Sequence, residues 1–331
     1  MSGRLRVLTW HVHGTYLRSL AHLPHDIVLP VRGDGEPGYG GRAGDFDWPA
    51  NVLEVPAEEV TRTEVDLVLH QTHRNWTVDR HELLSDAQRA LPQVAVEHDP
   101  PRRSPVDERH PVDDPHASIV HVTHFNRLMW DCGDVPTTVV EHGLPEPRGV
   151  RWTGELERAL VIVNEMPRRG RRVGFDLYED LARRLPVDLI GMGSEAVGGL
   201  GEVPPLEVAA FASRYRVLLS PIRWTSLNMS ICEAMLIGMP VVGFATTELS
   251  DVVEDGVSGF VSTDPTQVEA SLRLVLSDAE LAGCLGEGAR RTAVARFGID
   301  RFVRDWDRVL RAAVSRHRPV ATNGSVERMV R

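Results

Sequence analysis

Short apolar runs of strand character alternate with helix-like segments along the chain, and this alternation limits the fold more than any other feature of the sequence. Apolar runs of this length predict buried strands. Strands that alternate with helices predict a parallel, doubly wound α/β sheet. The strands expected in the first half are Leu5–Trp10, Asp26–Val31, Val65–His70, Gln93–Glu97, Ser118–Val122 and Thr137–Glu141, with helices at Tyr16–Ala21, Arg80–Ala90 and Phe125–Cys132.

The alternation restarts after Glu141–Trp152, a stretch with proline and glycine that is typical of an interdomain linker. The later expected strands are Leu160–Asn164, Val187–Ile190, Val217–Ser220 and Pro240–Phe244, and the helices are Val173–Leu185, Pro205–Ser213, Asn228–Ile237, Val268–Leu276, Asp278–Phe297 and Ile299–Ser315. We therefore predict two tandem Rossmann-like α/β domains, residues 1–145 and 146–298, followed by a helix at 299–315 and a flexible tail at 316–331. The two domains are expected to face a central cleft, because ligands of such folds bind at the carboxyl ends of the strands.

Composition excludes several classes of protein. The formal net charge of −10 disfavours nonspecific binding to nucleic acid or to anionic lipid. The three cysteines are widely spaced and form no CxxC pair, which favours a reducing, cytoplasmic setting and argues against a structural zinc site. The longest apolar run, Ser230–Ala245, is interrupted by a glutamate, a glycine and a proline, so no transmembrane segment is expected. The N-terminus lacks the pattern of a secretory signal.

The stretch from Trp224 to Gly259 has the features of a nucleotide site. A polar turn follows the expected strand Val217–Ser220, and a helix begins near Ser226–Asn228. The free N–H groups and the dipole of a helix N-terminus attract a phosphate. Glu233 lies about one and a half turns into this helix, where a carboxylate can reach a ribose diol, as an acidic residue does in dinucleotide-binding folds. This segment therefore predicts binding of a nucleotide.

Several motifs of this region resemble, in order and spacing, the C-terminal signature of retaining GT-B glycosyltransferases: Glu233-Ala234-Met235, Gly238, Pro240-Val241-Val242, Asp255-Gly256 and Gly259-Phe260-Val261. Within that fold the chain is most similar to glycosyltransferase family 4 (glycosyl transferases group 1). A weaker similarity extends over the whole chain. It includes the last long helix, which in that family crosses back onto the N-terminal domain.

The resemblance implies roles for the helix start and shows one departure from the family. Glu233 resembles the second acid of the family's E-x7-E motif, which binds the ribose. The first acid of that motif falls on Thr225, and Ser226 and Asn228 replace the small glycines that usually follow, so the loop facing the sugar is altered. Backbone N–H groups of Leu227, Asn228 and Met229 can still hold a diphosphate, because they need no particular side chain.

A second match lies in the basic loop Val161–Gly174. The family's lysine-glycine pair resembles Arg169-Gly170, and the arginine expected earlier in the loop falls near Asn164. The chain has no lysine, so all 37 basic residues are arginines, which also reflects the codon bias of a GC-rich genome. Arginine forms bidentate contacts with phosphate. Arg168, Arg171 and Arg172 can supply the missing charge, although a solvated basic loop would show the same pattern.

The remaining candidate residues come from the ends of other strands. Gly14 follows the first strand and allows close approach of a ligand, and Val203 lies in a segment that cradles the nucleobase in the family. His98 ends the fourth strand, where related enzymes point a histidine at the reacting sugar. The expected catalytic residues are thus His98, Arg169 and Arg172; the donor-binding residues Gly14, Arg168, Val203, Thr225, Ser226, Leu227, Asn228, Met229 and Glu233; and the acceptor-binding residues His13 and Asp99, with no metal ligand among them.

The resemblance implies a hexosyltransferase-like enzyme that moves a sugar from a nucleoside-diphosphate sugar to an acceptor hydroxyl. It implies retention of the anomeric configuration, with the leaving phosphate taking the acceptor proton and with no metal or other cofactor. The nucleotide sugar is then a co-substrate, and the sequence does not identify the acceptor, a small molecule or a glycan.

Three other functions remain open. Thr225 at the acid position also fits a catalytically silent GT-B protein that binds a nucleotide sugar or a partner enzyme. A nucleotide-sugar epimerase on the same fold would convert the donor without an acceptor. A metal hydrolase is suggested by the histidine pairs His11/His13 and His70/His73, but no matching acidic ligand pattern follows them.

Overall fold

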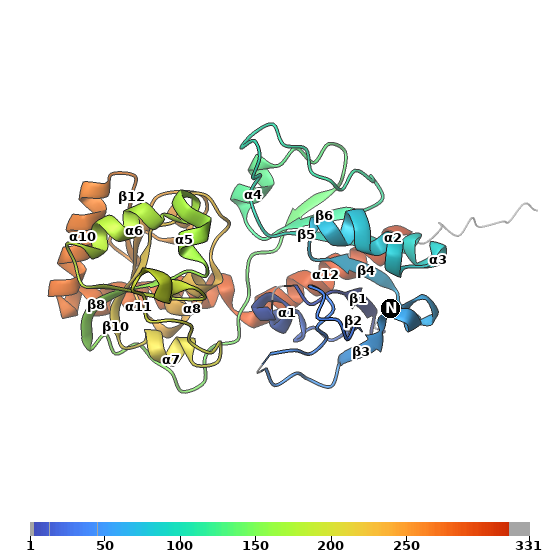
Figure 1. Cartoon of the computed structure of the whole chain (residues 1–331), viewed down its shortest axis with the longest axis horizontal. Coiled ribbons are helices and arrows are strands. Elements are labelled where there is room, and N and C mark those ends of the chain that lie inside the picture. The colour runs from blue at the N-terminus through green and yellow to red at the C-terminus, as the bar shows by residue number, and fades with distance from the viewer. Residues whose placement is uncertain (1–2, 13, 45, 318–331) are drawn as a thin grey trace, which may run out of the picture.

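The computed structural model describes residues 3–12, 14–44 and 46–317. Two α/β lobes lie side by side, each built on one parallel sheet (Figure 1). The strands of both sheets are short and apolar, and most of their residues are buried. The prediction of a GT-B-like arrangement of two doubly wound sheets is confirmed. Within the described residues, no helix is both long and apolar enough to cross a membrane.

The N-terminal lobe has a seven-stranded sheet in the order β3-β2-β1-β4-β5-β6-β7, in which every neighbouring pair is parallel. Its strands are β1 (Arg6–Thr9), β2 (Asp26–Val31), β3 (Val52–Pro56), β4 (Leu67–His70), β5 (Gln93–Glu97), β6 (Ser118–His121) and β7 (Thr137–Val139). Its helices are α1 (Gly14–Leu20), α2 (Arg80–Leu83), α3 (Asp86–Arg89) and α4 (His124–Met129), with a 3₁₀ turn at Ala57–Arg62 and a π turn at Asn75–Asp79.

Two expectations for this lobe were wrong. Strand β3 was not foreseen, because it lies at the edge of the sheet, alternates between buried and exposed residues, and ends in Pro56, which an edge strand tolerates. The single helix expected at Arg80–Ala90 is two short helices. Ser85 has an extended backbone and forms a capping box with Gln88, so it starts α3 anew.

The C-terminal lobe has a five-stranded parallel sheet in the order β12-β11-β10-β8-β9. Its strands are β8 (Leu156–Ile162), β9 (Val187–Ile190), β10 (Tyr215–Ser220), β11 (Val241–Phe244) and β12 (Gly259–Ser262). Its helices are α5 (Met166–Arg169), α6 (Phe175–Ala182), α7 (Val208–Ala212), α8 (Met229–Ile237), α9 (Leu249–Val252), α10 (Pro265–Ser277) and α11 (Ala279–Phe297), with 3₁₀ turns at Gly170–Val173 and Ser194–Val197.

The basic loop after β8 is more ordered than expected. It contains the one-turn helix α5 and a 3₁₀ turn before α6 begins at Phe175. Gly170 and Gly174 have positive φ angles of 57° and 77°, so each ends one turn and redirects the chain. A Cβ at Gly174 would lie 1.8 Å from the carbonyl oxygen of Pro221, so this loop packs directly against the segment that follows β10.

The last helix, α12 (Ile299–His317), returns to the N-terminal lobe (Figure 1). Its buried residues Phe302, Trp306, Leu310 and Ala313 belong to the same apolar core as β1 and α1. The indole N–H of Trp306 donates to the Tyr16 hydroxyl over 3.1 Å. The first lobe is therefore completed by the end of the chain. The boundaries at 145 and 298 stay a prediction, and residues 318–331 of the expected tail lie outside the described residues, while Arg316 and His317 belong to α12.

Candidate functional site

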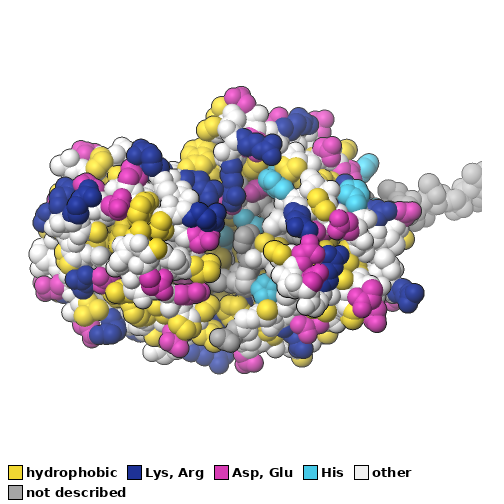
Figure 2. All heavy atoms as spheres, viewed as in Figure 1, with side chains coloured by type: hydrophobic (Ala, Val, Ile, Leu, Met, Phe, Trp, Pro, Cys, Tyr) yellow, Lys and Arg dark blue, Asp and Glu magenta, His cyan; other side chains and the backbone are white. Residues whose placement is uncertain are grey.

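A cavity of about 360 Å³ lies between the two lobes. Figure 2 shows the molecule hollowed there, with arginine and histidine side chains at the rim. The carboxyl ends of β5, β8 and β10 meet at this cavity, as the fold requires. It is lined from the N-terminal lobe by Thr15, Tyr16, His98, Asp99 and His142, and from the C-terminal lobe by Ile162, Asn164, Arg169, Ile190, Gly191, Glu202, Val203, Pro205, Val208, Ile222, Thr225, Ser226, Leu227, Asn228, Met229, Ser230 and Glu233.

The start of α8 is fixed from three sides. The Asn228 side-chain oxygen accepts from the N–H of Ser230 over 3.3 Å, while its amide nitrogen donates to the carbonyl of Ile162 at the end of β8 over 3.1 Å. The carbonyl of Leu227 lies 3.0 Å from Nε2 of His142 in the other lobe. The loop expected to hold a diphosphate is therefore pinned to the sheet below it and to the N-terminal lobe. This loop lines the cavity at the N-terminus of a nine-residue helix, the end of a helix dipole that attracts anions.

Glu233 points its carboxyl into the same cavity, one turn further along α8. Burial raises the pKa of this carboxyl to about 7, and the distant charge of Arg18 opposes the shift only weakly. A carboxyl with a raised pKa at the wall of a cavity is typical of a functional site, because its charge is stabilised only when a ligand supplies hydrogen-bond donors.

Thr225 and Ser226 occupy the wall next to the helix start. The Thr225 hydroxyl donates to the carbonyl of Ser226 over 2.8 Å, so it is already engaged within the loop. The Ser226 hydroxyl is buried and has no hydrogen-bond partner among the described residues. A buried hydroxyl without a partner at a cavity wall is costly unless a ligand or water completes it. The position of the family's first acid thus presents neutral hydroxyl groups.

The arginines of the loop after β8 divide into two sets. Arg169 lines the cavity, and burial together with the positive charge of Arg172 lowers the pKa of its guanidinium. Arg168 is exposed and forms an ion pair with Glu165, and Arg171 pairs with Asp176 over 2.5 Å. Arg168 and Arg172, both expected at the site, lie outside the cavity lining.

One other expected position that the structure describes is not part of the lining. Gly14 begins α1 beside the cavity residue Thr15, but it is packed against Phe46 and His11 rather than exposed to the cavity. His13 lies outside the described residues. The other expected residues, from both lobes, do come together in one cavity: His98, Asp99, Arg169, Val203, Thr225, Ser226, Leu227, Asn228, Met229 and Glu233.

The structure adds residues that the sequence did not single out. Tyr16 is buried at the cavity wall, and its ring packs edge-on against that of His98 at a centroid distance of 4.6 Å. Nε2 of His98 lies 3.1 Å from the side-chain oxygen of Gln71. Tyr16 gave no signal because it reads as an ordinary apolar position of a helix. Gln71 gave none because only the loop conformation after β4 directs its amide toward His98.

The lobes contact each other beside this cavity. The Trp224 indole N–H donates to the carbonyl of Pro101 over 2.8 Å, and its ring packs edge-on against Phe125. Buried Glu248 accepts the N–H groups of His124 and Phe125 at the start of α4 over 3.3 and 2.8 Å. Trp224 joins the segment after β10 to the segments after β5 and β6, and Glu248 joins the segment after β11 to the start of α4, so the two lobes are connected beside the cavity.

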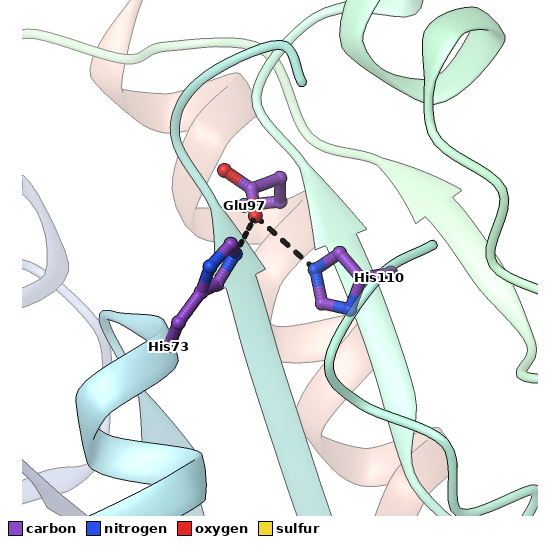
Figure 3. A group of neighbouring side chains, drawn as sticks. All are labelled: His73, Glu97 and His110. Atoms are coloured by element: carbon purple, nitrogen blue, oxygen red, sulfur yellow. Dashed lines mark hydrogen bonds and ion pairs between the residues drawn. The ribbon is translucent and has the colours of Figure 1, made fainter. Parts of the chain in front are cut away.

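A second cavity of about 380 Å³ lies in the N-terminal lobe and shares His98 and Asp99 with the first. His73, Glu97 and His110 gather at its edge, with their ligand-type atoms within 4.8 Å of one another (Figure 3). This is the one group of three metal-ligand-type residues within the described residues. It does not include His70, which is buried and bonds to Gln93 over 2.7 Å, so the pair His70/His73 is not a shared ligand pair.

Comparisons with known proteins agree with this geometry. Residues 158–278 match the family model described as Glycosyl transferases group 1, so the chain contains a domain of that family. No curated protein sequence matches the chain.

Solved structures extend the likeness to the whole fold. Sucrose-phosphate synthase from Thermosynechococcus elongatus is 14% identical, with a TM-score of 0.69 over 95% of this chain and 100% of that one. HepE of Anabaena in complex with UDP is 13% identical, with a TM-score of 0.69 over 94% and 100% of the two chains. A glycosyltransferase from Rickettsia africae is 10% identical, with a TM-score of 0.63 over 94% and 99%. At these identities the likeness establishes the GT-B fold.

Proposed function

We propose that this chain, which contains a glycosyl transferases group 1 domain, transfers a sugar from a nucleoside-diphosphate sugar to an acceptor hydroxyl. The observation that carries the proposal is the cavity between the lobes. It combines a helix start, an arginine and the carboxyl of Glu233 at the end of the C-terminal sheet. The helix start can bind a diphosphate, the arginine can neutralise the negative charge of that diphosphate, and the carboxyl can bind a ribose diol.

A uridine nucleotide is the first donor to test. HepE of Anabaena, which shares the fold over nearly the whole chain, has been solved with UDP and with UDP-glucose. Placed by the same fold, the diphosphate would lie against the N–H groups of Leu227–Met229 and beside Arg169, and the ribose would reach Glu233. The base would lie toward Gly191 and Val203, which line the far end of the same cavity.

Stabilising the leaving diphosphate is the main catalytic task in such a reaction, because the bond to the sugar breaks with the development of negative charge on the phosphate oxygen. Arg169 and the start of α8 supply fixed positive charge where that oxygen lies. The proposed route is retention, as the resemblance to retaining GT-B enzymes implies, with the acceptor attacking on the face that the diphosphate leaves. The departing phosphate then takes the acceptor proton. No metal is needed for these steps.

Binding and turnover test the proposal separately. A thermal-shift panel of UDP, GDP, ADP and TDP should raise the melting temperature for one base, because a ligand at 100 times its dissociation constant adds about 2.7 kcal/mol. The nucleotide sugars of that base should then release nucleoside diphosphate when incubated with the protein and candidate acceptors. A protein that no nucleotide stabilises contradicts the proposal.

A second candidate is a GT-B protein that binds a nucleotide sugar without transferring it. The neutral side chain of Thr225, where the family has an acid, favours this alternative. It predicts calorimetric binding of the nucleotide sugar together with no transfer and no slow hydrolysis of the donor over many hours. Interconversion of two donor sugars without an acceptor would instead indicate an epimerase.

A further inference from the structure

The backbone of Asp99, at the wall between the two cavities, is held on both of its polar groups. Its N–H donates to Oε1 of Glu97 over 2.8 Å, and its carbonyl accepts from the indole N–H of Trp130 over 2.8 Å. The rings of His73 and His110 pack edge-on against the Trp130 ring at 5.6 and 5.1 Å. We call the four residues His73, Glu97, His110 and Trp130 the Asp99 clamp.

Glu97 is the centre of the Asp99 clamp and is buried. Its Oε2 lies 2.5 Å from Nε2 of His73 and 3.1 Å from Nε2 of His110, as the dashed lines in Figure 3 show. Burial alone would raise the pKa of this carboxyl. Hydrogen bonds from His110 and His73 outweigh burial and hold the pKa well below its ordinary range. Both carboxylate oxygens therefore accept hydrogen bonds, and the buried charge is compensated.

The hydrogen-bond pattern decides between a metal site and a hydrogen-bonded unit. Nδ1 of His110 accepts the N–H of Val112 over 3.1 Å, so the hydrogen of the neutral ring is on Nε2, the atom that faces Glu97. A metal ligand needs a lone pair on that nitrogen, and the second ring nitrogen of a metal-bound histidine ordinarily donates rather than accepts.

The spacing agrees with this assignment. Two ligand atoms that share a zinc ion at about 2.0–2.1 Å in a tetrahedral site lie about 3.3 Å apart. Nε2 of His73 and Oε2 of Glu97 are only 2.5 Å apart, which is a hydrogen bond. The two histidines therefore donate to the one carboxylate of Glu97, and the three residues do not share an ion.

We propose that the Asp99 clamp is a positioning unit for the transfer site, which fixes the segment His98–Asp99 in the wall common to the two cavities. This inference rests on the proposed function, because it assigns the clamp to sugar transfer. His98 is already oriented from its other side by Gln71 and Tyr16. The clamp adds the backbone restraint that keeps the His98 ring and the Asp99 carboxylate facing the cavity between the lobes.

Asp99 also connects the clamp to the arginines of the other lobe. Its carboxylate pairs with Arg102; the carboxylate raises the pKa of Arg169 and of Arg172, whereas the Arg102 guanidinium lowers both. A small displacement of the segment His98–Asp99 therefore moves groups that line the cavity from the lobe opposite the nucleotide-binding groups. Misplacing a group by about 1 Å at a reacting centre can cost about 100-fold in rate.

Two variants test the proposal without relying on one fold-sensitive change. Trp130→Phe keeps an aromatic ring but removes the indole N–H that holds the Asp99 carbonyl, and Glu97→Gln removes the compensated charge. Trp152→Phe is the matched control, because the Trp152 indole also donates to a backbone carbonyl, that of Tyr215, over 2.7 Å but in the C-terminal lobe. Three quantities are measured: turnover of the nucleotide sugar at saturating donor, the dissociation constant of the nucleoside diphosphate, and amide hydrogen exchange at Asp99.

We expect both clamp variants to lose about 10- to 100-fold in turnover, with the nucleotide dissociation constant unchanged within about twofold, because the nucleotide-binding groups belong to the other lobe. Exchange at the Asp99 amide should accelerate in Glu97→Gln and remain as in wild type in Trp152→Phe. If the clamp were only structural, both variants would lower stability and the amount of folded protein. Turnover per folded molecule and nucleotide binding would then not separate in this way.

Three results would overturn parts of the argument. Wild-type turnover and wild-type Asp99 exchange in both clamp variants of an active enzyme would overturn the positioning role alone. Stoichiometric zinc in the purified protein that Glu97→Gln abolishes would show that the cluster is a metal site instead. A wild-type protein that neither binds nor converts any nucleotide sugar would overturn the proposed function and, with it, the link from clamp to transfer.

Discussion

Replacing Glu233 by glutamine should change nucleotide-sugar binding and the stability of the free protein in opposite directions. The carboxyl lies at the cavity wall on α8, and burial raises its pKa to about 7. A ribose diol donates two hydrogens, so it stabilises the ionised carboxylate. The ligand therefore binds best to a form of the protein that is incompletely populated near neutral pH.

The magnitude follows from that pKa. About one in ten free molecules carries an ionised Glu233 at pH 6, and about nine in ten do at pH 8. An apparent dissociation constant equals the intrinsic one divided by the competent fraction, so wild-type binding should tighten about tenfold from pH 6 to pH 8. Glu233→Gln should bind more weakly at pH 8 and show none of this dependence.

A rise in pH that strengthens ligand binding through Glu233 should weaken the stability of the free protein. Below about pH 4, Glu233 is protonated in both the folded and the unfolded chain and contributes no difference. Between there and pH 7 the unfolded chain releases a proton that the folded protein retains, so the folded state loses stability as the pH rises. Glutamine removes this loss. The melting temperature of free Glu233→Gln minus that of free wild type should therefore increase from pH 5 to pH 8.

Calorimetry at pH 6, 7 and 8 and thermal unfolding over the same range measure both effects. The ligand should be a nucleotide sugar, because the terminal phosphate of a free nucleoside diphosphate itself titrates near pH 6. Wild-type affinity that is independent of pH, or the same pH dependence in wild type and in Glu233→Gln, would refute the assignment of Glu233 to the ribose.

Three further predictions concern the cavity and the two lobes. Arg169→Ala should lower turnover about 10- to 100-fold in an assay of nucleotide release from the donor. The control Arg183→Ala removes an exposed arginine that pairs with Asp180 and should leave turnover unchanged. Equal rates in the two variants would exclude Arg169 from leaving-group stabilisation. Gly174→Ala should lower the free energy of unfolding in urea by more than about 2 kcal/mol, because the new Cβ would meet the Pro221 carbonyl. The control Gly198→Ala has a similar φ of 78° but no atom within 4 Å of the new Cβ, so it should cost only the backbone strain of about 1–2 kcal/mol. Trp306→Ala should destabilise by about 3–5 kcal/mol, and a loss below about 1 kcal/mol would show that α12 does not hold the N-terminal core.

Strands buried on both faces could be predicted from the sequence, because a continuous apolar run has few other structures available. The run Asp26–Val31 was predicted with the bounds of β2, and Gln93–Glu97 with those of β5. The edge strand β3 was missed because half of its side chains face solvent, and a proline ends it. Helix ends at Ser85 and Gly174 depended on local backbone geometry that hydrophobic periodicity does not report.

The candidate site divides in the same way. The segment Thr225–Met229 and Glu233 could be placed together from the sequence, since one turn and one helix hold all of them. The Asp99 clamp could not be predicted, because its members come from four separate segments. His73 follows β4, Glu97 ends β5, His110 lies in a loop and Trp130 follows α4. Neither their spacing in the sequence nor any periodicity indicates that these residues lie close together in the folded protein. The arginines of the loop after β8 looked equivalent in the sequence, and only their ion pairs separate Arg169 from Arg168.

The return of α12 to the first lobe has a consequence for biosynthesis. Ribosomes make a chain from its N-terminus, and domains ordinarily fold in that order as they emerge. Here the side chains of Phe302, Trp306 and Leu310, which complete the core around β1 and α1, are translated after the whole C-terminal lobe. The lobe made first is therefore finished last. Until then the apolar residues that α12 covers are exposed to solvent, where a chaperone can bind them, and a ribosome stalled before codon 299 would leave them uncovered.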